Sequence, residues 1–380
     1  MTVGIIGAGI AGLTLGCLLK QRGVECEIFE QSDDVTKYGA GISLTSNAQF
    51  PLNKLNILEE IKDAGCEPLD IVWREPNGKV IRNMSLSDFG HVITINRKDL
   101  IKILINKYNN LGGLINYNYE LDEIANTNQT VKFRNGEARD FKHIIACDGL
   151  RSVTRTSYVT DENPTYSGYT AWRGIGTSDS KRINIYLGPG SHVVCYPVDN
   201  KLNTSFIGIA KRNIFSEETW KREGDHTEMM NDLGNYDQFL HSLFKSSPKV
   251  YKWGLYLRNP LKKYCFNNLT LLGDAAHPIL PFLGQGGAMA IEDAYSFGSL
   301  LVIKNQNFKK TQKIFEKIRL NRVRSIDNAS KYQGMINHLS NKMLVNTRNF
   351  MLKNTNIASR RTSNTVSYTH LTLPTKPKVL

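Results

Sequence analysis

Short apolar runs and an amphipathic segment alternate at the start of the chain. Residues 3–6 predict a buried strand, and residues 24–29 predict a second one. Between them, apolar residues recur at helical spacing, and Gly23 stands just past the expected end of the helix. Two strands joined by a helix in this way are typical of a parallel βαβ unit.

The rest of the chain separates into buried, alternating and helical segments. Residues 141–146 and 269–272 predict further buried strands, whereas polar and apolar residues alternate over 70–96 and 165–260. Helical segments are expected at residues 100–108, 288–303 and 308–353. Segments typical of a parallel sheet thus bracket a β-rich middle. This order predicts an α/β protein with a discontinuous Rossmann-like nucleotide-binding domain, an inserted β-rich domain and C-terminal helices.

Charge is unevenly distributed along the 380 residues. The formal net charge is +13, and residues 301–361 alone hold 14 basic and 2 acidic residues, a net of +12. Residues 1–300 are close to neutral, so no nucleic-acid partner is expected for the body of the protein. We interpret the basic region as solvated helices, with association with a membrane surface as the alternative.

The cellular location of the protein and the redox state of its cysteines can be predicted from motifs that the sequence lacks. No apolar run approaches the ~20 residues that span a bilayer, and the N-terminus does not resemble a signal peptide, so a cytoplasmic protein is expected. None of the six cysteines forms a CxxC pair. We therefore predict buried, reduced thiols and no metal site.

Residues 7–12, GAGIAG, match the pattern GxGxxG. They follow the first predicted strand and open the predicted helix, and Glu30 ends the second strand. Together these features form a dinucleotide-binding fingerprint, in which Gly7 allows the tight turn, Gly9 lets the backbone approach a pyrophosphate and Gly12 allows close helix–strand packing. The helix N-terminus offers N–H groups to phosphates, and Glu30 can accept hydrogen bonds from ribose hydroxyls.

One fingerprint leaves open both an NAD-dependent dehydrogenase and an FAD enzyme, and three later segments bear on the choice. Residues 96–100 place Arg97 at the start of a predicted helix, and residues 147–155 follow a buried strand, as a ligand-binding turn does. In residues 272–293 a strand ends in a Gly-Asp pair, a Pro- and Gly-rich loop follows, and a helix begins. Asp274 can bind a sugar hydroxyl, and the loop N–H groups can face an electron-rich ring edge.

With these motifs in this order, the chain resembles the class A flavoprotein aromatic monooxygenases, the family of p-hydroxybenzoate hydroxylase. It is most similar to the branch of salicylate hydroxylase, zeaxanthin epoxidase and urate hydroxylase. The resemblance covers about residues 2–330. It rests on the GxGxxG unit with Glu30, the DG segment at 148–155 and the GD segment at 273–278, together with residues 39–42, 47–48, 169–174 and 196–197.

The resemblance implies a non-covalently bound FAD and NAD(P)H as a transient co-substrate. By the same resemblance Glu30 binds the adenosine ribose, Arg97 lies near the FAD pyrophosphate and Asp274 binds the ribityl or pyrophosphate region. The DG segment would serve FAD and NAD(P)H together, and residues 284–287 would border the isoalloxazine ring. The implied cofactor-binding residues are Gly7, Gly9, Gly12, Glu30, Arg97, Asp148, Gly149, Gly273, Asp274, Pro281, Gly284, Gln285, Gly286 and Gly287.

The resemblance also implies a division of the chain into domains. The expected parts are an FAD-binding domain at residues 1–70, 98–160 and 261–300, a substrate domain at 71–97 and 161–260, C-terminal helices at 301–355 and a tail at 356–380. The tail continues no helical pattern and resembles translated adaptor sequence, so we give it no functional weight.

The implied reaction is a monooxygenation. NAD(P)H reduces FAD, the reduced flavin forms a C4a-hydroperoxide with O₂, and one oxygen atom hydroxylates or epoxidises an electron-rich aromatic or polycyclic small molecule. Two alternatives stay open: a flavin-dependent oxidase or reductase on the same fold, and a non-catalytic flavin-binding redox sensor. Neither the substrate nor the oligomeric state follows from the sequence.

Three residues of the β-rich middle are candidates for the substrate pocket. Arg173 would suit an anionic substrate such as a carboxylate, with a structural ion pair as the alternative. Tyr196 is the second candidate. His192 lies on a predicted strand and either lines the pocket or faces solvent. His277, within the GD segment, is expected to be structural or adjacent to the flavin, and no side chain is assigned a catalytic role.

Overall fold

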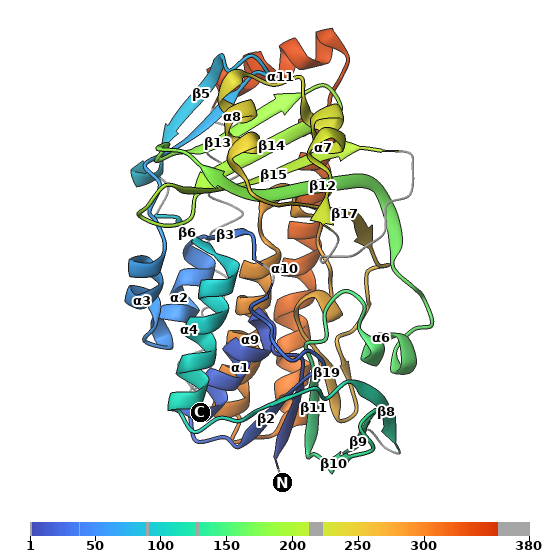
Figure 1. The fold of residues 1–380 in the computed structure, drawn as a ribbon. Helices are drawn as coiled ribbons and strands as arrows, with labels where there is room; N and C mark the ends of the chain where they lie inside the picture. The colour runs from blue at the N-terminus through green and yellow to red at the C-terminus, as the bar shows by residue number, and fades with distance from the viewer. Residues whose placement is uncertain (1, 38, 89–90, 126–128, 213–222, 356–380) are drawn as a thin grey trace, which may run out of the picture.

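The computed structural model describes residues 2–37, 39–88, 91–125, 129–212 and 223–355. The expected tail at residues 356–380 lies outside the described residues. Within them, two main sheets and the surrounding helices form an α/β architecture, as predicted (Figure 1). No helix in these ranges is both long and apolar enough to cross a lipid bilayer.

A six-stranded sheet holds the predicted βαβ unit. Its strands, in spatial order, are β18 (Cys265–Phe266), β19 (Leu269–Leu271), β11 (His143–Ala146), β1 (Val3–Ile6), β2 (Cys26–Glu30) and β7 (Ile115–Tyr117). All neighbours run parallel except β18 and β19. Helix α1 (Ile10–Gln21) connects β1 to β2, so the predicted unit is confirmed.

Helices cover one face of this sheet, and a small antiparallel sheet covers the other. The helices are α1, α4 (Arg97–Asn110) and α9 (Gly286–Ile303), and the small sheet consists of β8 (Leu121–Ala125), β9 (Thr130–Phe133) and β10 (Ala138–Asp140). Successive side chains of a strand point to opposite faces of the sheet, so one strand can contact both layers. Ile28 points to Gly16 of α1, whereas its neighbour Phe29 stacks on Phe133 with ring centroids 4.8 Å apart.

The β-rich middle forms an eight-stranded sheet. Its strands, in spatial order, are β16 (Glu223–Gly224), β17 (Val250–Leu257), β12 (Thr165–Thr177), β15 (Asn203–Lys211), β14 (Ser191–Pro197), β13 (Ile183–Gly188), β4 (Asp70–Arg74) and β5 (Val80–Ser85). Neighbours are antiparallel except β13 and β4. Helices α7 (His226–Leu233) and α8 (Gln238–Ser246) cover the face that carries Trp172 and Phe206.

The opposite face of the eight-stranded sheet is called the inner face below. It carries Ala171, Ile209 and Trp253, which pack against Leu280 and Phe282. Because these last two residues follow the GD segment, the inner face lies over the loop that the sequence assigns to the cofactor.

Shorter elements complete the fold: β3 (Gly41–Leu44) paired with β6 (Ile93–Asn96), α2 (Ser46–Lys54), α3 (Leu58–Ala64), α6 (Val153–Tyr158), η1 (Leu86–Asp88), η2 (Gly273–Ala275) and η3 (Pro281–Leu283).

The C-terminal region, expected to be helical over residues 308–353, forms two helices. Helix α10 (Phe308–Asn337) runs from the six-stranded sheet to the eight-stranded sheet, and α11 (Lys342–Asn354) follows it beside β5 (Figure 1). The expected helical segment is interrupted at residues 338–341. There the His338 ring donates from Nδ1 to the Gly334 carbonyl at 2.7 Å, and the Asn341 side chain caps α11 by accepting from Met343 and Leu344 N–H groups.

All six cysteines are free, as predicted. Four are buried, and two, Cys66 and Cys265, are half-buried. Burial raises the pKa of Cys26 to about 11 and that of Cys195 to about 12. These thiols therefore stay protonated and unreactive at neutral pH.

Candidate cofactor and substrate site

The loop between β1 and α1 depends on two glycines that tolerate no side chain. Gly7 has a φ of +102°, and a Cβ there would overlap the carbonyl oxygen of Cys147. A Cβ on Gly12 would overlap the carbonyl oxygen of Gly7. Gly9 differs, because its φ is −76° and a Cβ there would have no atom within 4 Å. The backbone of Gly9 therefore borders open space at the N-terminus of α1, where a phosphate can approach.

Glu30 closes this loop from the end of β2. Its Oε2 accepts a hydrogen bond from the Ala8 N–H at 2.8 Å, and its Oε1 accepts from the Ser32 N–H at 2.9 Å. These bonds fix the carboxylate beside the glycine loop. Each oxygen has a further lone pair, so sugar hydroxyls can bind in addition.

Three charged residues from distant parts of the chain meet at this site. Arg97 begins α4, and its side chain interacts electrostatically with Asp274 and Glu30. Burial lowers the pKa of Arg97, and the two carboxylates oppose that shift. Desolvation by the surrounding protein raises the pKa of Asp274, while His277 and Arg97 act in the opposite direction. The Asp274 side chain is nevertheless exposed, so a polar ligand can reach its carboxylate.

The DG segment forms a turn that is stabilised from within. Gly149 has a φ of +77°, and Asp148 Oδ2 accepts from the Thr154 N–H at 3.0 Å. Asp148 therefore stabilises the turn that leads into α6. Burial raises the pKa of this carboxyl. Arg155, buried in α6, donates to the carbonyl oxygens of Ala275 and Ala276 at 3.4 and 3.0 Å, which joins the DG segment to the GD segment.

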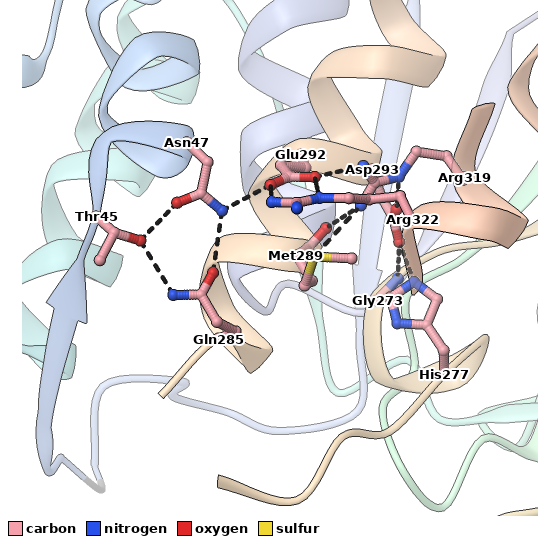
Figure 2. A network of polar contacts seen from close by, with 10 residues as sticks. All are labelled: Thr45, Asn47, Gly273, His277, Gln285, Met289, Glu292, Asp293, Arg319 and Arg322. Carbon is pink, nitrogen blue, oxygen red and sulfur yellow. Dashed lines mark hydrogen bonds and ion pairs between the residues drawn. The ribbon is translucent and has the colours of Figure 1, made fainter. Parts of the chain in front are cut away.

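A buried polar network joins the GD segment to α9 and α10 (Figure 2). Asp293 Oδ2 accepts from the Gly273 N–H at 2.9 Å and lies 2.5 Å from His277 Nε2, and its Oδ1 accepts from Arg319 Nε at 2.6 Å. Burial opposes ionisation of Asp293, but His277 and Arg319 lower its pKa to about 2. His277 therefore has a carboxylate partner within the protein.

The same network reaches the loop before α9. Asn47 Nδ2 donates to Glu292 Oε1 at 2.6 Å and to Gln285 Oε1 at 3.1 Å. Gln285 Nε2 in turn donates to Thr45 Oγ1 at 3.2 Å, and that hydroxyl donates to Asn47 Oδ1 at 2.5 Å. Arg322 adds an ion pair to Glu292 at 3.0 Å. Figure 2 shows these side chains as one connected set.

Arg173 lies buried on the inner face of the eight-stranded sheet. It stands two residues beyond Ala171 on β12, and its guanidinium lies 4.7 Å from the ring centroid of Trp253 and 5.5 Å from that of Tyr251. Burial lowers the pKa of Arg173 to about 10, and the charge of Arg97 adds to the shift. The structure thus brings Arg173 of the β-rich sheet close enough to Arg97, at the start of α4, for the two charges to interact.

Tyr196 and His192 lie on the same inner face, both on β14. His192 pairs with Ile209 across the sheet and is buried, so the alternative that it faces solvent is wrong. Its Nδ1 lies 3.0 Å from Nε2 of His338, and its ring lies 5.8 Å from the ring of Phe282. Burial lowers the pKa of His192 well below its usual range and raises that of Tyr196. Both side chains are therefore uncharged at neutral pH.

The fold and the site define a dinucleotide-binding protein of the α/β class whose nucleotide site faces a second, β-rich sheet. Three features fit FAD as the dinucleotide. Gly9 and Gly286, at the N-termini of α1 and α9, border open space. Asp274 offers an exposed carboxylate, and Glu30 offers spare acceptor capacity.

Comparison with known proteins gives the family. Residues 1–307 match the model of the FAD binding domain family, and the chain belongs to this family. It is 29% identical over 340 residues to 3-amino-4-hydroxybenzoate 2-monooxygenase of Streptomyces cremeus, covering 85% of this chain and 84% of that protein. It is 30% identical over 315 residues to aurachin C monooxygenase/isomerase of Stigmatella aurantiaca, covering 77% of this chain and 79% of that protein.

Solved structures agree on the fold. The structure of HpxO of Klebsiella pneumoniae complexed with FAD and uric acid superposes with a TM-score of 0.85 at 21% identity, covering 96% of each chain. Together, these comparisons confirm that the chain is an FAD-dependent monooxygenase that acts on a small molecule with O₂. NAD(P)H is the electron donor typical of this class.

Sequence reasoning missed several residues that the structure places at the site. Arg319, Arg322, Glu292 and Asp293 form the charged part of the network, and His338 is the partner of His192. One signal was available, because Glu292 and Asp293 are adjacent acidic residues in an otherwise apolar helical segment. Two carboxylates that are buried side by side require cationic partners.

Proposed function

We propose that the protein hydroxylates an aromatic carboxylate, which binds between the inner face of the eight-stranded sheet and the loop at residues 281–287. The main support is the buried guanidinium of Arg173, held on that face by the rings of Trp253 and Tyr251. A guanidinium suits a carboxylate because it is always charged and can donate two parallel hydrogen bonds to it. The relative from Streptomyces cremeus carries an aromatic carboxylate, 3-amino-4-hydroxybenzoate, in its name.

Two further side chains of the inner face would contribute to this pocket. Tyr196 and His192 are both uncharged at neutral pH, as their pKa shifts indicate. They can therefore hydrogen-bond a phenolic hydroxyl or a ring nitrogen without adding charge. The aromatic ring of the substrate would pack against the apolar part of the same face, where Ile209 and Phe282 lie.

The same proposal assigns the cofactor residues. Glu30 would bind the adenosine ribose, Arg97 the pyrophosphate and Asp274 the ribityl region, with the glycine loop at residues 7–12 supporting the phosphates. Residues 284–287 would border the flavin ring. Bound FAD supplies the two-electron redox chemistry and the activation of O₂. Asp148 and Gly149 would support the site through the shape of their turn, since Asp148 already bonds to Thr154.

We also propose a division into domains. Residues 1–70, 98–160 and 261–300 would form the FAD-binding domain, and residues 71–97 and 161–260 the substrate domain. The strand order supports this division, since the six-stranded sheet draws its strands from the first set and the eight-stranded sheet, apart from Asp70 at the start of β4, from the second. Strand β6 pairs with β3 between the two sheets and marks the junction.

The purified protein is expected to be yellow and to carry FAD that heat or acid releases intact. The glycine loop is open at Gly9, Glu30 and Asp274 offer acceptors for sugar hydroxyls, and no His or Cys of the sequence lies in a motif for covalent flavin attachment. Chromatography of the released flavin against FAD and FMN standards measures this. Release of FMN, or a folded protein that takes up no flavin, would contradict the cofactor assignment.

The substrate assignment is tested by NAD(P)H oxidation. We expect hydroxybenzoates and related aromatic carboxylates to stimulate O₂-dependent NAD(P)H consumption and to gain one oxygen atom, measured by mass spectrometry. Their esters serve as matched controls and should stimulate far less. Equal stimulation by acids and esters would refute the anionic substrate. Oxidation of substrate without oxygen incorporation would favour an oxidase.

Asp274→Ala is expected to weaken FAD binding more than Asp99→Ala. Asp274 is exposed at the site and interacts with Arg97, whereas Asp99 lies in the first turn of α4. Loss of an acceptor for a sugar hydroxyl corresponds to about 1–3 kcal/mol. The measurement is FAD titration of the apoprotein followed by flavin fluorescence. Equal affinities in the two variants would remove Asp274 from the cofactor site.

A further inference from the structure

We propose that Arg319 is a positioning residue for both cofactor-facing loops, residues 273–277 and residues 284–287, so that helix α10 completes the FAD site. The match to the FAD binding domain family ends at residue 307, and α10 begins at Phe308. The inference rests on the proposed function insofar as these loops are taken to hold the flavin. The contacts of Arg319 with Glu292 and Asp293 do not depend on that function.

The starting point is a pair of buried carboxylates. Glu292 and Asp293 are consecutive residues on α9, with 0% and 1% of their surface exposed. Two adjacent ionised groups in such a place are strongly unfavourable unless cations and hydrogen bonds compensate them. The compensation comes from α10. Arg319, 0% exposed, donates from Nε to Asp293 at 2.6 Å and from Nη1 to Glu292, and Arg322, one turn later, pairs with Glu292.

From Asp293 the network leads into the GD segment. The oxygen that does not contact Arg319 accepts from the Gly273 N–H and bonds to His277. Gly273 has a φ of +58° and directly precedes Asp274, the proposed ribityl ligand. The carboxylate of Asp293 therefore holds residues 273–277 at both ends, through the backbone N–H of Gly273 and the side chain of His277. Arg319 fixes the carboxylate.

From Glu292 the network leads to the residue in front of α9. Thr45, Asn47 and Gln285 form a closed ring of three hydrogen bonds, and the second N–H of the Asn47 amide goes to Glu292. Each donor in this ring has one acceptor, so the orientations of both amides are determined. Gln285 stands between Gly284, with a φ of +64°, and Gly286, which starts α9. The ring therefore fixes the loop whose N–H groups would face the flavin.

The two hydrogen-bonded paths, through Asp293 and through Glu292, both start from the guanidinium of Arg319. A substitution of Arg319 should therefore affect both loops at once. A planar guanidinium can donate in two directions at once, whereas the ammonium of a lysine is a point charge on a flexible chain. Arg319→Lys keeps the positive charge but is expected to lose one of the two carboxylate contacts. Arg324→Lys is the matched control, since Arg324 is exposed on the same helix.

The primary measurement is amide hydrogen exchange of the apoprotein, which does not depend on FAD or on turnover. In Arg319→Lys, peptides covering residues 273–277 and 284–288 should exchange about tenfold faster, while peptides of α7 and α8 keep the wild-type rate. Arg324→Lys should match the wild type throughout. Unchanged exchange in the two loops, or an equal increase over the whole chain, would overturn the proposal.

FAD titration provides the second readout. The dissociation constant of FAD should rise about tenfold in Arg319→Lys, and the visible spectrum of the bound flavin should shift, while Arg324→Lys retains both wild-type values. If Arg319→Lys does not fold, the triple variant Arg319→Met, Glu292→Gln, Asp293→Asn removes the charge of Arg319 and those of both carboxylates together, and it should show the same loop exchange. A triple variant with wild-type exchange in both loops would refute the positioning role. A wild-type protein that binds no FAD would instead refute the proposed function and leave the exchange test intact.

Discussion

Gly12→Ala should abolish FAD binding and strongly lower the thermal stability of the protein. A Cβ at residue 12 would overlap the carbonyl oxygen of Gly7, so α1 must move away from β1. Forcing an atom into a close-packed contact costs about 1–3 kcal/mol or more, and this contact involves backbone that cannot rotate away. Thermal unfolding of the apoprotein and flavin content per chain measure the two effects.

Gly9→Ala is the matched control, because it separates the two roles of the glycine loop. Its φ of −76° suits alanine, and a Cβ there meets no protein atom within 4 Å. The apoprotein should therefore unfold at the wild-type temperature or slightly above it, since alanine restricts the unfolded chain more than glycine does. FAD affinity should still fall, because the methyl group occupies the space beside the helix N-terminus. Normal flavin content in Gly12→Ala would contradict the close helix–strand contact.

Arg173→Met should leave FAD content near normal and raise the KM for an aromatic carboxylate substrate. Removing a charge-assisted hydrogen bond corresponds to about 1.5–3 kcal/mol, which is about 10- to 150-fold in KM. A poorly held substrate should also lower the yield of product per NAD(P)H, with hydrogen peroxide accounting for the difference. Steady-state kinetics, product analysis and a peroxide assay measure these quantities.

Arg182→Met is the control for this change in charge, because Arg182 is exposed and pairs with Asp70 away from the inner face. Its KM and coupling should match the wild type. Loss of flavin from Arg173→Met, with an unchanged KM in the remaining holoenzyme, would assign Arg173 to the structure or to the cofactor site.

The dinucleotide fold was predictable because its signals are local. A short apolar run, a glycine turn and a helix lie next to one another in the first 30 residues, and Glu30 follows at the end of the second strand. The same holds for Gly273 and Asp274, which follow β19 after a single residue, Leu272. Each motif folds from its own neighbours, so spacing along the chain was enough to place it.

The polar network was not predictable, because its members meet only after the chain has folded. Arg319 is one of 14 basic residues between 301 and 361, and nothing in its immediate neighbours distinguishes it from a solvated charge. Arg319 meets the carboxylates of α9 only because α10 lies against α9 in the folded chain. The pairing of His192 with His338 spans 146 residues and is inaccessible to local patterns for the same reason. The break between α10 and α11 depends in part on His338, whose buried ring contacts β15 through the Ile209 carbonyl.

The position of β19 beside β11 has a consequence for the synthesis of the protein. β11 ends at Ala146, and its parallel neighbour β19 is complete only at Leu271, 125 residues later. At about 5–20 residues per second, a ribosome takes on the order of 10 s to deliver that strand. Throughout this interval β11 presents an unpaired edge to other nascent chains, which favours aggregation. We therefore expect the chain to require chaperone protection until more than two thirds of it has been translated, and to refold poorly from denaturant at high concentration.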